Sequence, residues 1–399
     1  MSNKPLNFLC ITTFFKGEAF LESCKAEGNN VYLLTKNELK DEAWPWNSID
    51  DVYYIEEWNH DNVIKGIAYK FRSIKFDRFV ALDDFDVEKV ALLREHFRMP
   101  GMGHTTAHYF RDKLAMRMKA KEEGVNVPEF TGLFHDADIN AYADRVSPPW
   151  LIKPRSEASA TGIKKIHSKD DLWNVLNELG DERDKYLIEK FAPGDVYHVD
   201  GLNMSGKVVF SRVSKYLDTP FEVAHGGGIF RSATCEMGSK DEKGLTKMNK
   251  DVMKAFGMKY GASHTEFIKS KDTGELFFLE TASRVGGANL AEMVAFASGV
   301  NLWGEWAKIE TKTLKGQAYT LPKTQNKYAG IVVSLSRFEH PDTSSFTDPE
   351  IVWRMDKKWH IGLIVVSDSS ARVMELLDNY TNRIANEFHA SLPAPDKSR

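Results

Sequence analysis

The segment HTEFIKSKDTGELFFLETASR, residues 264 to 284, constrains the fold more than any other part of the chain. Apolar runs flank a Lys-Asp-Thr-Gly sequence, which is typical of a β-hairpin. A turn centred on Thr273 places Glu266 opposite Glu280, whereas a register shifted by one residue would turn one glutamate to solvent. Opposed carboxylates among apolar residues are costly, so we expect a cation between them. Mg²⁺ on a nucleotide fits, because carboxylates and phosphate oxygens complete its octahedron.

The same register places His264 opposite Ala282 and Ile268 opposite Phe278. His264 is either a base that activates an amine or a histidine that only packs in the hairpin, and the sequence leaves both open. Arg284 follows at the expected end of the strand, where a guanidinium can approach the same phosphates or a carboxylate.

Three further basic residues lie next to loops or helix starts that could bind anions. Lys153 ends the apolar strand WLIKP, and the following loop RSEASATG, which includes Ser159, could close over phosphates. Lys113 belongs to a basic helical segment and by itself predicts only a solvated surface charge. Arg231 follows three glycines in HGGGIFRSA, where it could hold a carboxylate, although a surface loop explains the pattern equally well.

Composition and charge exclude several classes of partner. The 53 basic and 57 acidic residues give a net charge of -4 and are interspersed, so no basic field exists to hold nucleic acid. The three cysteines are widely separated, which indicates reduced thiols rather than a metal site. Neither a signal peptide nor an apolar stretch of membrane-spanning length is evident, so we expect a cytoplasmic protein without a membrane partner.

The order of predicted strands and helices indicates an α/β and α+β protein. Residues 1–105 alternate strand and helix like a Rossmann-like unit, but the G-x-G-x-x-G motif of dinucleotide-binding proteins is absent. The middle of the chain combines helices with antiparallel strands. Residues 311–399 offer two or three strands, one helix and a polar tail that we expect to be disordered.

Four motifs along residues 105–305 together resemble the ATP-grasp superfamily, and the first hundred residues resemble the Rossmann-like domain that normally precedes it. In order, they are a D-K-x-x-M-R helix ending in G-V-x-x-P, a K-P strand with a small-residue loop, an E-K-F strand end followed by Gly-Asp, and the glutamate pair with E-x-x-x-R. The resemblance implies a first domain over 1–105, an ATP-grasp domain over 106–310 with a lid at about 127–188, and a small α+β subdomain over 311–399.

The resemblance also implies ATP as a cofactor. Its phosphates would be bound by Lys113, Lys153 and Ser159, and the main chain around Lys190 and Phe191 would contact the adenine.

The ribose and the metal would be bound by acidic residues. By the same resemblance, Glu189 with Asp195 or His198 would lie near the ribose. Glu266 and Glu280 would be the ligands of Mg²⁺, with Mn²⁺ as an alternative metal.

One position departs from the common pattern of the superfamily. Much of the family has E-x-N-x-R, with the asparagine as a further metal ligand, whereas this chain has Ala282. A bidentate Glu280 or water would then complete the metal shell. The variants PRSEASATGI, HTE and E-x-A-x-R resemble the L-amino-acid ligase subgroup, in which that asparagine is likewise missing.

We therefore expect an ATP-dependent ligase that joins a carboxylate to an amine through an acyl phosphate, with amino acids as substrates. Arg284 would stabilise the tetrahedral oxyanion or the departing phosphate. Two alternatives stay open: a carboxylase of the biotin-carboxylase kind, which forms carboxyphosphate, and a non-catalytic ATP-binding regulator. A homodimer through the first domain or residues 311–390 is a further expectation.

Overall fold

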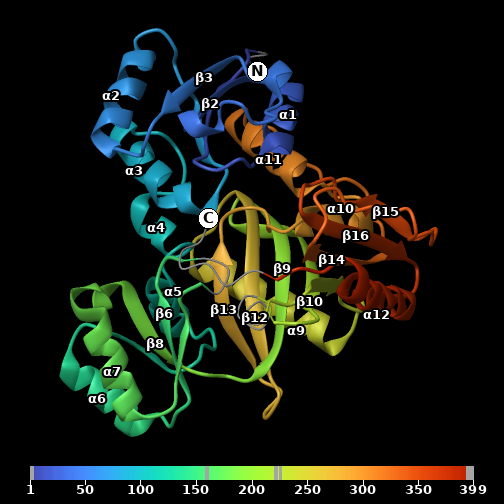
Figure 1. Ribbon diagram of the computed structural model, residues 1–399. Coiled ribbons are helices and arrows are strands. Elements are labelled where there is room, and N and C mark those ends of the chain that lie inside the picture. The colour runs from blue at the N-terminus through green and yellow to red at the C-terminus, as the bar shows by residue number, and fades with distance from the viewer. Residues whose placement is uncertain (1–3, 158–160, 220–222, 224–226, 392–399) are drawn as a thin grey trace.

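A computed structural model describes residues 4–157, 161–219, 223 and 227–391 (Figure 1). The chain begins with a parallel sheet of four strands in the order β3-β2-β1-β4. Buried apolar residues fill β1 on both faces, as is typical of a parallel strand covered by helices. The strands of this sheet are β1 (Asn7–Ile11), β2 (Asn30–Lys36), β3 (Asp51–Ile55) and β4 (Arg78–Ala81). Its helices and 3-10 turns are α1 (Glu18–Ala26), η1 (Asn37–Leu39), η2 (Trp46–Ser48), α2 (His60–Phe71), η3 (Asp84–Asp86) and α3 (Val87–Phe97). This arrangement confirms the Rossmann-like character predicted for the first part of the chain.

A second, smaller sheet forms the part of the molecule at the lower left of Figure 1. Two helices pack on it around the buried side chains of Trp150 and Ile152. Its antiparallel strands, in the order β5-β8-β6-β7, are β5 (Phe130–Gly132), β6 (Trp150–Pro154), β7 (Lys164–Ile166) and β8 (Tyr186–Lys190). The helices are α6 (Asp136–Arg145) and α7 (Lys169–Leu179), and the short η4 (Gly180–Lys185) follows. This unit corresponds to the segment expected to act as a lid.

The central sheet has eight strands in the order β13-β12-β9-β10-β11-β14-β16-β15. Because β14 pairs with β11, the strands of the last segment extend the central sheet instead of forming a sheet of their own. The strands are β9 (Gly194–Met204), β10 (Lys207–Tyr216), β11 (Phe230–Thr234), β12 (Gly261–Ser270), β13 (Leu276–Ala282), β14 (Tyr328–Leu335), β15 (Ile351–Arg354) and β16 (His360–Ser367).

Helices cover the central sheet and join it to the first domain. α12 packs on β14 and β16, α9 on β10, and α11 lies between β12 and α1 of the first domain. The helices of this part are α4 (His104–His108), α5 (Lys113–Glu122), α9 (Lys240–Ala255), α10 (Leu290–Ser298), α11 (Leu302–Leu314) and α12 (Ser370–Glu387). Among the described residues, no helix is both long and apolar enough to span a bilayer.

The hairpin of β12 and β13 has the predicted register at its functional end. Glu266 lies opposite Glu280, and His264 lies opposite Ala282. A β-bulge follows, so that Phe267 pairs with Phe278. The predicted pairing of Ile268 with Phe278 is therefore wrong, because the bulge adds one residue to β13 and Ile268 pairs with Phe277.

Candidate active site

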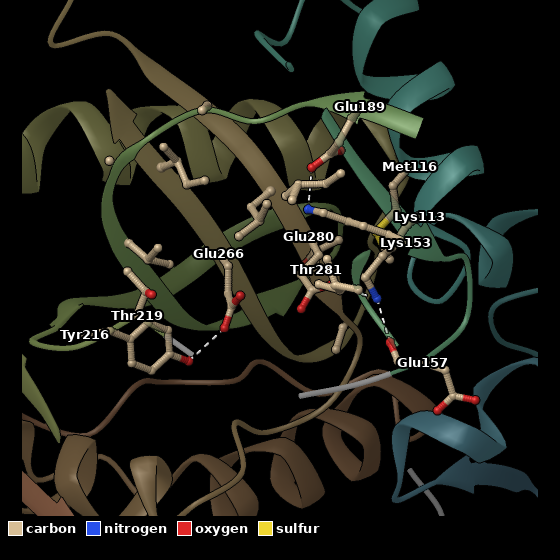
Figure 2. Close-up of a pocket in the computed structure, with 18 of the residues that line it drawn as sticks. Lys113, Met116, Lys153, Glu157, Glu189, Tyr216, Thr219, Glu266, Glu280 and Thr281 are labelled. Atoms are coloured by element: carbon tan, nitrogen blue, oxygen red, sulfur yellow. Dashed lines mark hydrogen bonds and ion pairs between the residues drawn. The ribbon is translucent and has the colours of Figure 1, made fainter. Parts of the chain in front are cut away.

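A cavity of about 750 Å³ lies at the meeting point of the small sheet, the central sheet and the first domain. Ten of the residues singled out from the sequence line it, namely Lys113, Lys153, Glu189, Lys190, Phe191, Asp195, His264, Glu266, Glu280 and Arg284. Figure 2 shows how several of them point toward one another from strands of both sheets and from α5. His198 and Arg231 do not line it, and Ser159 lies outside the described residues.

A buried charge cluster closes one end of the cavity. The Lys153 ammonium contacts Glu189 Oε1, and Arg117 donates through Nε to Glu189 Oε2 over 3.0 Å. Burial alone would raise the pKa of the Glu189 carboxyl, but the charges of Arg117 and Lys153 outweigh it and hold that pKa below its usual value. Both oxygens of Glu189 contact cations of the protein, and its role near the ribose stays a prediction.

Lys113 lies at the first position of α5, where the helix dipole adds positive potential. Asp112 caps this helix by accepting hydrogen bonds from the amides of Leu114 and Ala115 at 2.9 and 3.2 Å. The Lys113 ammonium is 2.9 Å from Glu280 Oε2 and donates to the carbonyl of Glu157 over 2.6 Å. It therefore connects the β13 carboxylate to the loop that follows β6.

The two opposed glutamates have different partners. Burial alone would raise the pKa of Glu280, but the charge of Lys113, supported by Lys153 and Arg117, holds it well below the usual value. Glu266 Oε1 accepts a hydrogen bond of 2.8 Å from the Tyr216 hydroxyl, as Figure 2 shows. Glu280 thus has cationic partners and Glu266 a hydroxyl donor, and both side chains line the same cavity.

His264 is held on both sides by carboxylates. Its Nδ1 is 2.8 Å from Asp200 Oδ1, and its Nε2 is 3.5 Å from Glu266 Oε1. Burial opposes protonation, yet Asp200 and Glu266 raise the pKa of His264 to about 9. The raised pKa favours the protonated imidazole, and the role of His264 as a base stays a prediction.

The segment after β8 supplies main-chain groups to the cavity. The amide of Lys190 donates to the carbonyl of Glu129 over 2.7 Å, and the amide of Phe191 donates to the carbonyl of Pro149 over 3.1 Å. These two N–H groups are therefore used within the protein and are not available to an adenine ring. Asp195 lines the cavity with its carboxylate 2.7 Å from the Lys215 ammonium.

Two predicted residues lie away from the cavity. His198 is fully buried, with its ring 4.7 Å from that of Tyr216 and with hydrogen bonds to Asp200 and Ser232. Arg231 forms ion pairs with Asp218 at 2.8 Å and Asp378 at 3.0 Å. The ribose role of His198 and the substrate role of Arg231 are not supported, because both side chains already have polar partners outside the cavity.

Several cavity residues were not predicted. Arg111 donates to Asp84 Oδ2 over 2.8 Å, stacks 4.2 Å from the ring of Phe85, and contacts the carbonyl of Ser156. Two adjacent acidic residues directly after the apolar strand of the first domain were a usable signal for Asp84. Tyr216 gave no such signal, because a tyrosine in an alternating strand is ordinary.

Comparison with known proteins gives the class of the fold. Residues 146–292 match the ATP-grasp domain family. The crystal structure of an L-amino acid ligase from Bacillus licheniformis covers 99% of this chain and 100% of its own, with a TM-score of 0.74 and 16% sequence identity. The biotin carboxylase domain of a Hydrogenobacter thermophilus 2-oxoglutarate carboxylase, solved with MgADP, covers 94% of this chain and 90% of its own, with a TM-score of 0.71 and 16% identity. Residues 146–292 thus match the ATP-grasp domain, and the chain has the fold of ATP-grasp enzymes, in agreement with the resemblance found in its sequence.

Among curated proteins the similarity points to ligases. The L-arginine-specific L-amino acid ligase of Bacillus subtilis is 28% identical over 261 residues, which are 64% of this chain and 62% of that protein. A D-alanine–D-alanine ligase of Neisseria gonorrhoeae is 25% identical over 204 residues, which are 50% of this chain and 66% of that protein. In both cases this chain matches less than two thirds of the relative's length.

Proposed function

We propose that this protein is an ATP-dependent ligase that joins a carboxylate to an amine, with amino acids as substrates, through an acyl phosphate. The observation that carries the proposal is the set of charges in one cavity. Glu266 and Glu280 oppose each other, Lys113 pairs with Glu280, and Lys153 lies against Glu189 within the same cavity. The names of the curated relatives, an L-amino acid ligase and D-alanine–D-alanine ligases, support the same reaction class.

The residues fit a divalent cation. The pKa of Glu280 lies well below its usual value, so this carboxylate is ionised at neutral pH, and Glu266 faces it across the hairpin. Ionised carboxylate oxygens are the ligands that Mg²⁺ prefers. When bound, Mg²⁺ would supply charge neutralisation at the phosphoryl oxygens of ATP.

The basic residues fit the charge that develops during phosphoryl transfer. Lys113 at the start of α5 and Lys153 at the end of β6 would bind phosphate oxygens as the substrate carboxylate attacks the γ-phosphate. The amine would then attack the acyl carbon of the acyl phosphate, and phosphate would leave. Arg284 lines the cavity and donates only to its neighbouring Val285 carbonyl among the described residues, over 2.8 Å. Its guanidinium would stabilise the oxyanion or the departing phosphate.

The small sheet would act as a lid that excludes water from the acyl phosphate. Lys113 holds the Glu157 carbonyl, and Arg155 pairs with Asp112 at the cap of α5. These contacts connect the loop after β6 to the helix that carries a phosphate-binding lysine. Closure of the lid and phosphate binding would therefore be coupled.

A phosphate-release screen over pairs of amino acids, with mass spectrometry of the products, tests the proposal. We expect release that requires both a carboxylate and an amine, together with a dipeptide product. Glu280→Gln should reduce turnover at least 100-fold, roughly the effect of removing one electrostatic catalytic group. Bicarbonate-dependent release would instead indicate a carboxylase, and ATP binding without turnover would indicate a regulator.

A homodimer and a cytoplasmic location stay predictions for this chain. Light scattering of the purified protein would test the first, and fractionation of the source cells would test the second.

A further inference from the structure

A continuous chain of polar contacts crosses three neighbouring strands behind the metal-facing glutamate. It runs from Tyr216 on β10 through Glu266 and His264 on β12 to Asp200 on β9. Asp200 also holds His198 through a contact of 2.7 Å. Asp200 and His198 are fully buried, so these two members of the network do not exchange partners with solvent.

The network ends on only one of the two oxygens of Glu266. Oε1 receives the Tyr216 hydroxyl at 2.8 Å and faces His264 Nε2 at 3.5 Å. Among the described residues no hydrogen bond is formed to Oε2. Figure 2 shows the carboxylate held on the Tyr216 side while it extends into the space next to Glu280. The side chain is therefore fixed with one oxygen used by the protein and the other available.

Gly286, two residues after Arg284, leaves room for this network because it has no side chain. A Cβ at Gly286 would lie 2.7 Å from Asp200 Oδ1 and 2.9 Å from His264 Nδ1, closer than real Cβ atoms approach other atoms. Gly286 thus packs directly on the Asp200–His264 hydrogen bond. Ala282, which lies opposite His264, adds no polar group that could compete for the imidazole.

We propose that Tyr216 and Asp200 are positioning residues that make Glu266 a one-oxygen metal ligand. Tyr216 occupies Oε1 directly, and Asp200 acts through His264, whose ring it orients toward the same oxygen. Outer partners of this kind orient metal ligands, and their loss commonly weakens metal binding by about 10- to 100-fold. The inference rests on the proposed metal role of Glu266, so the experiment must separate that role from the positioning role of Tyr216 and Asp200.

The test is a titration of the full-length protein with Mn²⁺ in the presence of ADP, followed by electron paramagnetic resonance. We expect Tyr216→Phe, Asp200→Asn and Gly286→Ala each to weaken Mn²⁺ binding about tenfold. Binding of metal-free ADP, followed by calorimetry, should not change. The metal concentration for half-maximal activity should rise in each variant, while most of kcat should return at saturating metal. A general folding defect would lower kcat at every metal concentration.

Matched controls are available in the same sheet. Tyr197 donates to Asp241 at 3.3 Å away from the cavity, so Tyr197→Phe and Asp241→Asn should bind Mn²⁺ like the unmodified protein. Mn²⁺ binding that is lost in Glu266→Gln but unchanged in Tyr216→Phe and Asp200→Asn would overturn the positioning role alone. Mn²⁺ binding that survives in Glu266→Gln would overturn the metal role itself. Tyr216→Phe removes a single oxygen atom and so keeps the test valid if Asp200→Asn fails to fold.

Discussion

Around Glu189, one buried carboxylate pairs with two cations, Arg117 and Lys153. Arg117 and Glu189 are almost completely buried, and Lys153 is nearly so. Removing one member of a buried ionic group leaves the remaining charges without a partner, which costs about 3–5 kcal/mol. We therefore expect Glu189→Gln to lower the free energy of unfolding by about 3 kcal/mol, measured by urea denaturation. Glu178→Gln, which breaks an exposed pair with Lys164, should change it by less than about 1 kcal/mol.

The pH dependence of this effect has a definite sign. The pKa of Glu189 in the folded protein is lower than its usual value of 4.5. The stability that the carboxylate contributes is therefore fully present above pH 4.5 and is lost as the pH falls through the lower, folded-state pKa. The difference in unfolding free energy between the unmodified protein and Glu189→Gln should shrink over that acidic range. A difference that stays constant down to the acid transition would contradict the assignment of the charge cluster.

At the scale of single elements, the start of α5 couples helix stability to the site. Asp112 caps the helix and directly precedes Lys113, so Asp112→Ala should cost about 1 kcal/mol of stability and also displace the lysine. We expect a severalfold higher KM for ATP, measured in the phosphate-release assay. Asn59 caps α2 in the same way but away from the cavity. Asn59→Ala should give a similar loss of stability with an unchanged KM for ATP. An equal KM in both variants would contradict the coupling between the cap of α5 and ATP binding.

The hairpin shows what local sequence can predict and where it fails. The turn sequence and the apolar runs that flank it were enough to place Glu266 opposite Glu280. The bulge beyond that pair was not predicted, and the residues of β13 at the bulge contact a distant part of the chain. Arg117, from α5, contacts the carbonyl of Leu279, and its guanidinium lies 5.8 Å from the ring of Phe278. The partners of His264 likewise come from β9 and β10, so its protonated state could not be read from the hairpin alone.

At the scale of the whole molecule, the order of motifs predicted the ATP-grasp fold, but not how its parts join. The segment after residue 311 was expected to be a small α+β subdomain, and the structure shows that its strand β14 adds to the central sheet through β11. This pairing joins residues about 100 positions apart, and the local sequences of β11 and β14 do not specify their neighbours. The same limit applies to α11, whose contacts with α1 attach the first domain.

A buried ion pair at this junction offers a test of how the first domain is attached. Arg78 at the start of β4 is 2.6 Å from Glu310 on α11, and both side chains are nearly buried. Because Glu310→Gln leaves the guanidinium without a counter-charge, we expect the free energy of unfolding to fall by about 3 kcal/mol. Limited proteolysis should then cut between the first domain and the remainder sooner than in the unmodified protein.

Neither Arg78 nor Glu310 lines the cavity, so the affinity for ADP, measured by calorimetry, should stay within about twofold, a change worth under 0.5 kcal/mol. Glu375→Gln, which removes an exposed partner of Arg372, is the matched control and should alter neither stability nor proteolysis. A fall in ADP affinity as large as the fall in stability would instead mean that the first domain and the nucleotide cavity respond as one cooperative unit.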